Sequence, residues 1–178
     1  MLGRRAFSRI FQFWRDEDGV SSIEFVILYP LFYWILFMGV ELGVMQARQA
    51  MLEMALDRTV RHVRLNTIAP PSYQDLRDVM CAEATFLNNC SNSLKLEMVR
   101  RDPRVGVTLN APQCHDKPSA VNPAGPFSPG GQNELMFLRV CVLQPPLLPT
   151  IGLNPYLPTT ETGEYRLVAI TSYVTEPA

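Results

Sequence analysis

Residues 25–40 (FVILYPLFYWILFMGV) contain no charged or amide side chain, and this run limits what the chain can fold into. Between residues 20 and 47 the only charged side chains are Glu24 and Glu41. A membrane-spanning helix needs about 20 mostly apolar residues, so this longer stretch is sufficient to cross a bilayer. On a helix rising ~1.5 Å per residue the two carboxylates lie about 25 Å apart, each near one membrane interface.

Three ordinary interpretations of the run compete with a specialised one. A secretory signal peptide has an apolar region of about 7–15 residues and a small-residue cleavage site after it, and no A-x-A triplet follows this run. A buried core helix is disfavoured because the run is apolar on all faces. A plain single-pass anchor stays open as an alternative.

The composition excludes several functional classes. The chain is 47% hydrophobic and 19% charged with a net charge of −1, unlike a disordered chain or a basic nucleic-acid binder. It has two His residues and no glycine-rich phosphate loop. No carboxylate pair, catalytic triad or metal cluster is visible, so we expect no enzymatic activity, no cofactor, no metal and no nucleic-acid partner.

A carboxylate at the start of the run has no purpose in a simple anchor, and an ionisable group there indicates a function with a specific partner. The arrangement from Gly19 to Phe25 (GVSSIEF) resembles the prepilin processing site, where a membrane peptidase cuts after the glycine on the cytoplasmic side. The resemblance implies a mature N-terminus at Val20, with Glu24 in the fifth position. Glu24 would then pair with the α-ammonium group of an adjacent subunit, because an unpaired charge is costly in a low-dielectric filament core. The alternative is a Glu24 solvated at the interface.

The stretch 16–43 (DEDGVSSIEFVILYPLFYWILFMGVELG) resembles the N-terminus of TadE/TadF-like pseudopilins, minor components of the tight-adherence (Flp-type) pilus system. Pro30 fills the proline position of the family pattern, and Glu41 with Gly43 approximates its acidic residue before glycine. The chain end 169–177 (AITSYVTEP) and a cysteine pair followed by an alternating strand are also similar to this family.

This resemblance implies a role in pilus assembly rather than catalysis. The implied partners are a prepilin peptidase, other pilin and pseudopilin subunits, an inner-membrane pilus assembly platform and membrane lipid. Whether the chain is the E-like or the F-like member, and whether it enters the filament or only primes assembly, stays open. The alternative function is an uncleaved single-pass membrane protein whose periplasmic domain binds a ligand or an envelope partner.

Basic residues before the run predict a cytoplasmic N-terminus, a single pass through the bacterial inner membrane and a periplasmic C-terminal part. The predicted organisation is a cytoplasmic leader at 1–19, a transmembrane helix at 20–47, its amphipathic continuation at 48–65, and a periplasmic α+β domain at 66–178.

One long helix is expected over residues 22–65, about 66 Å at ~1.5 Å per residue. Beyond residue 42 its apolar and polar positions recur every three or four residues, which is typical of an amphipathic helix. Pro30 should kink this helix or interrupt its hydrogen-bond ladder. Gly39 and Gly43 are spaced for close helix packing, for which Pro30 and Glu41 are also candidates.

The fold class expected for the rest is α+β, with a short helix packed on an antiparallel sheet of three or four strands. The helix is predicted at residues 73–87, and the strands at 94–100, 105–109, 135–143 and 165–174. Two proline-rich loops, at 110–133 and 144–163, have no assigned role.

Four cysteines follow the apolar run and allow three disulfide connectivities. On the periplasmic side disulfides persist, and we favour Cys81–Cys90 with Cys114–Cys141. Zinc binding at Cys114 and His115 is the rival interpretation, but no C-x-x-C motif or second nearby His supports it.

Overall fold

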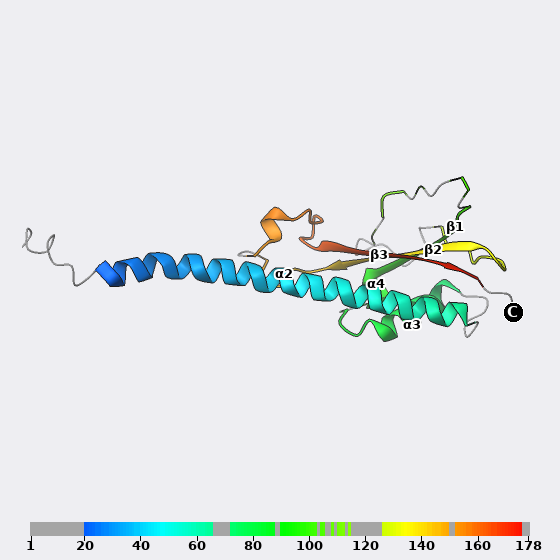
Figure 1. Ribbon diagram of the computed structural model, residues 1–178, viewed down its shortest axis with the longest axis horizontal. Helices are drawn as coiled ribbons and strands as arrows, with labels where there is room; N and C mark the ends of the chain where they lie inside the picture. The colour runs from blue at the N-terminus through cyan, green and yellow to red at the C-terminus, as the bar shows by residue number, and fades with distance from the viewer. Residues whose placement is uncertain are drawn as a thin grey trace, which may run out of the picture. The chain divides into compact units, whose positions relative to one another are not determined.

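A computed structural model describes most of the chain after residue 19, namely residues 20–65, 72–87, 90–102, 104–105, 108, 110–112, 114, 126–149 and 152–175. The elements in chain order are α2 (Val20–Arg64), α3 (Tyr73–Glu83), α4 (Cys90–Ser93), β1 (Leu94–Arg100), β2 (Leu135–Gln144), the 3₁₀ helix η2 (Asn154–Tyr156) and β3 (Tyr165–Val174) (Figure 1). A long apolar N-terminal helix and a small domain with an antiparallel sheet confirm the α+β prediction. The chain divides into two compact units between Val40 and Glu41.

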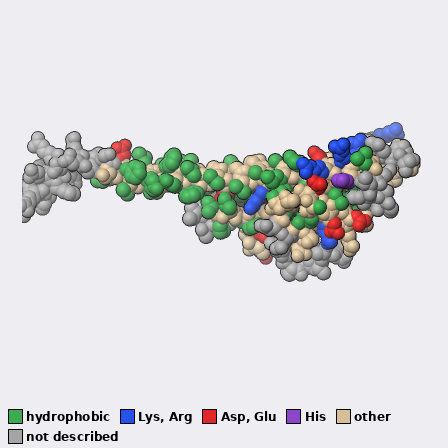
Figure 2. Space-filling model, turned by 90° about the horizontal axis from the view of Figure 1, so that it is seen from below, with side chains coloured by type: hydrophobic (Ala, Val, Ile, Leu, Met, Phe, Trp, Pro, Cys, Tyr) green, Lys and Arg blue, Asp and Glu red, His purple; other side chains and the backbone are tan. Residues whose placement is uncertain are grey.

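The part of α2 that precedes Glu41 is apolar on every side. Its large hydrophobic side chains, from Ile23 to Val40, are exposed, and Figure 2 shows apolar side chains covering this part of the helix. The helix continues through Pro30, although a proline has no N–H group to donate to the ladder. Pro30 therefore does not end the helix, and its effect on the ladder is limited to the hydrogen bond that its missing N–H group cannot make.

The part of α2 after Glu41 is amphipathic and belongs to the compact unit that holds the sheet. Its buried positions recur every three or four residues, as the sequence predicted: Leu52, Ala55, Leu56, Thr59, Val60 and Val63. The Thr59 hydroxyl donates to the carbonyl of Ala55 (2.8 Å), so this buried polar group is satisfied within the helix.

The three strands form an antiparallel sheet in the order β1-β2-β3. Because side chains alternate between the two faces, one register row, Leu96–Val140–Ala169, lies wholly on the core face. This face packs on α2 and α3 in one hydrophobic cluster. The sheet and helices surround that core, and β1, β2 and β3 are drawn together above α3 in Figure 1.

Two predicted elements differ from the structure. The strand predicted at 105–109 is wrong where the chain is described, because Val105 lies in a turn, is 85% exposed, and donates its N–H to the carbonyl of Asp102 (3.2 Å). The Asp102 side chain accepts from the N–H of Arg104 (2.9 Å), so Asx-type turn chemistry overrides the alternating pattern. The helix predicted at 73–87 ends at Glu83, where Ala84 leaves the helical conformation.

Candidate functional site

The predicted processing site lies at the beginning of the described chain. Gly19 is outside the described residues, and Val20 is the first residue of α2. Glu24 and Phe25 follow in the second turn of α2, and both side chains are exposed. The Glu24 carboxylate therefore projects from a helix whose neighbouring side chains are apolar.

A line of aromatic rings follows one side of this helix. Phe25, Tyr29, Tyr33 and Phe37 recur every four residues, and successive ring centroids are 5.2, 4.3 and 6.1 Å apart. Residues four apart lie above one another on a helix, so these rings form a continuous aromatic stripe. The stripe is a surface available to lipid or to another helix.

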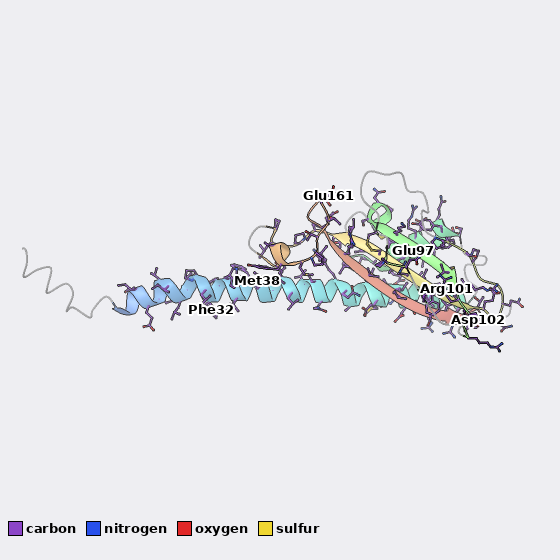
Figure 3. All side chains as sticks on the ribbon, turned by 90° about the horizontal axis from the view of Figure 1, so that it is seen from above. Phe32, Met38, Glu97, Arg101, Asp102 and Glu161 are labelled. Atoms are coloured by element: carbon purple, nitrogen blue, oxygen red, sulfur yellow. A yellow bond between two sulfur atoms is a disulfide. The ribbon has the colours of Figure 1, made fainter. Side chains whose placement is uncertain are left out.

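The described chain holds one helix that is long and apolar enough to cross a membrane. Phe32 points away from the helix in Figure 3 and is 62% exposed. An added Cβ would meet no atom within 4 Å at Gly39 or at Gly43. Close helix packing at these two glycines stays a prediction.

Glu41 has an environment that the sequence did not indicate. Its side chain is 1% exposed, and its two carboxylate oxygens accept hydrogen bonds from the N–H groups of Leu148 (3.3 Å) and Leu153 (2.5 Å). A Cβ added at Gly152 would overlap the Glu41 carboxylate, so the loop backbone approaches this side chain without an intervening group. These two hydrogen bonds fix the proline-rich loop to α2.

The next turns of α2 bind the same region of the chain. Arg48 donates to the carbonyl of Pro145 (2.8 Å) and to the hydroxyl of Tyr165 (2.7 Å). Gln49 donates to the carbonyl of Val168 on β3 (3.0 Å). The polar residues of α2 just after the apolar run thus hold a loop and a strand in place.

The face of the sheet that points away from the hydrophobic core carries a buried ion pair. Glu97 on β1, labelled in Figure 3, lies directly across from Arg139 on β2, and their side chains are 9% and 10% exposed. Nε of Arg139 donates to the Glu97 carboxylate (2.7 Å), Nη2 donates to the same oxygen, and Nη1 donates to the carbonyl of Asn110 (2.5 Å). These bonds satisfy the guanidinium group and anchor the chain near Asn110 to the sheet.

Both disulfides have the connectivity that we favoured. Cys81 of α3 is bonded to Cys90 of α4, with a Cα–Cα distance of 5.6 Å, and Cys114 is bonded to Cys141 of β2 at 5.2 Å. Because Cys114 is in a disulfide, it offers no free thiolate for zinc. His115, its predicted companion, lies outside the described residues.

The described residues hold no arrangement typical of catalysis. No group of three or more His, Cys, Asp or Glu side chains within them is placed to hold a metal ion. Tyr173 is the buried group outside the apolar helix with a shifted pKa, which burial raises from 10.0 to about 12. Its hydroxyl contacts the sulfur of Met98 (3.7 Å), so it is a packed core residue.

Sequence reasoning missed the contacts of Glu41, Arg48, Glu97 and Arg139. For Glu41 the sequence did hold a signal of its position. A carboxylate followed by amphipathic spacing marks the point where the helix leaves the apolar segment. No local pattern indicates the Glu97–Arg139 pair, since its members lie 42 residues apart and meet only through strand register.

The comparison with family models matches almost the whole length of α2. A family model described as TadE-like protein matches residues 19–61. Neither the curated proteins nor the solved structures contain a match. The matched segment begins at the predicted cleavage glycine, overlaps the candidate membrane span Ser22–Arg64 up to residue 61 and ends in the turns of α2 that pack on the sheet. The chain therefore carries a TadE-like segment at residues 19–61.

Proposed function

We propose that this protein is a TadE/TadF-like pseudopilin that takes part in the assembly of a tight-adherence (Flp-type) pilus. The observation that carries the proposal is the TadE-like match over residues 19–61. The exposed apolar helix supports the proposal, because such a surface has to be covered by lipid or by other helices. The role is structural, and the protein is a substrate of an enzyme rather than an enzyme.

The proposed processing step is cleavage after Gly19 by a prepilin peptidase. The charged leader at 1–19 supports it, as does the GVSSIEF motif at residues 19–25. Cleavage would place a new α-ammonium group at the helix N-terminus, where the positive end of the helix dipole disfavours a cation. The exposed carboxylate of Glu24 from an adjacent subunit would compensate that charge.

The proposed location is the bacterial inner membrane, with a cytoplasmic N-terminus and a periplasmic domain. One candidate span and a pilus-related family fit a membrane protein. The two disulfides support the orientation, since disulfides persist in oxidising compartments. Other pilins and pseudopilins, the assembly platform and lipid are the proposed partners.

Intact mass and N-terminal sequencing of membrane-extracted protein test the processing step. In cells that hold the peptidase we expect a start at Val20, and in cells without it a start at Met1. Gly19→Val should block cleavage, because a side chain hinders approach of the protease to the backbone. Gly39→Ala is the matched control, since an added Cβ at Gly39 meets open space. A start at Met1 in cells with active peptidase would favour the uncleaved single-pass alternative.

Glu24→Gln tests the pairing role with a side chain of the same shape. We expect normal membrane insertion but reduced piliation, measured by electron microscopy and by counting pilin in sheared fractions. Glu161→Gln, a change at an exposed loop carboxylate, is the control and should leave piliation intact. Normal piliation of the Glu24→Gln strain would remove the role assigned to Glu24.

A further inference from the structure

A groove runs between the last turns of α2 and the free edge of β3. Its volume is about 450 Å³, and its walls include Val60, Arg61 and Leu65 from the helix and Thr171, Ser172 and Tyr173 from the strand. All of these residues belong to one compact unit. The groove is therefore a feature of the folded domain itself.

The strand wall of this groove has backbone groups directed away from the sheet. In an antiparallel pair alternate residues bond to the neighbouring strand, and the residues between them face outward. The N–H of Thr175 bonds to the carbonyl of Glu134 on the β2 side (3.2 Å), whereas the carbonyl of Val168 accepts from Gln49 on α2. By alternation the N–H and C=O groups of Ile170, Ser172 and Val174 face outward with Val168.

The outward groups of Ile170, Ser172 and Val174 are not paired within the described part of the chain, in contrast to the other edge of the sheet. There the N–H of Met98 on β1 donates to the carbonyl of Pro126 (3.1 Å), and the N–H of Ser128 donates to the carbonyl of Met98 (3.0 Å). One edge of the sheet is thus covered by the chain, and the other presents a template for a further strand.

Two of the exposed side chains on the free edge of β3 are large and apolar, which is typical of an interface and not of an edge protected against pairing. Ile170 is 50% exposed and Val174 is 48% exposed. Proteins usually protect an edge with lysine, proline or a bulge, and residues 170–174 (ITSYV) contain no charge and no proline. An unprotected β-branched edge beside a groove favours strand addition by a partner.

The charge of the helix wall indicates the chemistry of that partner. Among the described residues that line the groove, Arg61 and Arg64 are basic and Asp57 is acidic, so this part of the lining has a net positive charge. Arg61 also faces an adjoining hollow with Arg58 and His62, and Figure 2 shows Lys and Arg side chains gathered near a His side chain. Two copies of this groove facing each other would bring like charges together, which disfavours a second copy as the occupant.

We propose that this groove binds an extended acidic segment of a partner protein as an added strand. The outward N–H and C=O groups of Ile170, Ser172 and Val174 would supply the main-chain hydrogen bonds, and Arg61 would bind a carboxylate of the segment. The proposal is independent of cleavage at Gly19 and of the family assignment.

The full chain in detergent micelles, titrated with a fluorescein-labelled peptide, tests the proposal by fluorescence anisotropy. The probe alternates Val with Asp and has Thr at both ends, and the matched probe has Lys in place of Asp. We expect saturable binding of the Asp peptide, weakened by salt, and at least tenfold weaker binding of the Lys peptide.

Two pairs of variants separate strand addition from general attraction. Ser172→Pro removes an outward N–H that β2 does not use, and Ser172→Ala keeps it, so only the proline variant should weaken binding, by about tenfold. Arg61→Glu should weaken binding of the Asp peptide and strengthen binding of the Lys peptide. Arg104→Glu, an exposed change in the turn that follows β1, should do neither. Circular dichroism melting shows whether each variant is folded.

Equal binding of the Asp peptide to the folded Ser172→Pro and Ser172→Ala variants would overturn the proposal. Equal binding of the Asp and Lys peptides would also overturn it. A dimer in analytical ultracentrifugation that Ser172→Pro dissociates, without peptide binding by the wild type, would assign the edge to a second copy and overturn the acidic partner.

Discussion

The carboxylate of Glu41 lies against the backbone of Gly152, so closely that a Cβ at this glycine would overlap it. Glu41 lies at the boundary between the two compact units, and Gly152 belongs to the proline-rich loop that follows β2. The contact gives a physical reason for a glycine at this position of a loop that has no recognisable motif. It also shows that a helix residue predicted near the membrane interface has a binding partner within its own domain.

Gly152→Ala should lower the free energy of unfolding by about 1–3 kcal/mol, the usual cost of overpacking. In a Glu41→Ala background the same change should cost less, because the overlapping side chain is gone. Chemical denaturation of the four proteins in detergent, followed by circular dichroism, measures this coupling. Gly131→Ala is the control, since an added Cβ there makes only ordinary contact with Glu134 (3.5 Å). Equal costs of Gly152→Ala in both backgrounds would show that the contact with Glu41 is not the cause.

Removing one member of the Glu97–Arg139 pair should destabilise the domain more than removing both. Glu97→Leu leaves the Arg139 guanidinium buried without its carboxylate, at an expected cost of about 3–5 kcal/mol. The double variant Glu97→Leu with Arg139→Met should recover much of that loss, because two apolar groups need no partner. Urea unfolding of the single and double variants tests this, and a double variant less stable than either single one would contradict it.

The disulfide that closes the longer loop should contribute more stability. Cys114 and Cys141 are 27 residues apart, and Cys81 and Cys90 are 9 apart. The loop-entropy relation predicts that replacing either pair by alanine lowers the free energy of unfolding by about 2–4 kcal/mol. The loss should be about 1 kcal/mol larger for Cys114 and Cys141 than for Cys81 and Cys90. Thermal unfolding of the two double variants ranks them, and the reverse order would show that local packing outweighs loop closure.

The stability of the domain should decrease in alkaline solution through Tyr173. Burial raises the pKa of this residue to about 12, whereas the unfolded chain releases the proton near 10.0. The unfolded state therefore binds fewer protons between these values, so the free energy of unfolding falls there by at most about 1.4 kcal/mol per pH unit. Below that window Tyr173 contributes no pH dependence. Tyr173→Phe should lose less stability from neutral pH to pH 12 than the wild type, as measured by urea unfolding at each pH.

Much of the fold follows from local pattern. The 3–4 spacing of apolar residues after position 42 predicts the buried stripe of Leu52 and Leu56, and alternation predicts β1 and β3 with their observed bounds. Patterns of this kind are visible because one helix face or one strand face meets a single core. Where two preferences compete, as at Asp102 and Val105, the turn chemistry prevailed over alternation.

The site is predicted less completely, because its contacts join distant parts of the chain. The proposed roles of Gly19 and Glu24 come from a short motif whose residues are close together in the sequence. The groove of Arg61 and Ser172 has no such motif, because its walls come from residues more than a hundred positions apart.

The sequence alone determined the apolar segment, the family resemblance of the N-terminal segment and the helix and strand periodicities, and it suggested the proposed processing motif. These depend on neighbouring residues, whose spacing decides which face of an element is apolar. Only the tertiary structure decided that Glu41 binds the loop at Leu148 and Leu153, that Glu97 pairs with Arg139, and that one edge of β3 stays open beside Arg61. These features depend on strand register and on how a loop folds back, where small differences in packing free energy over long chain separations choose among many arrangements.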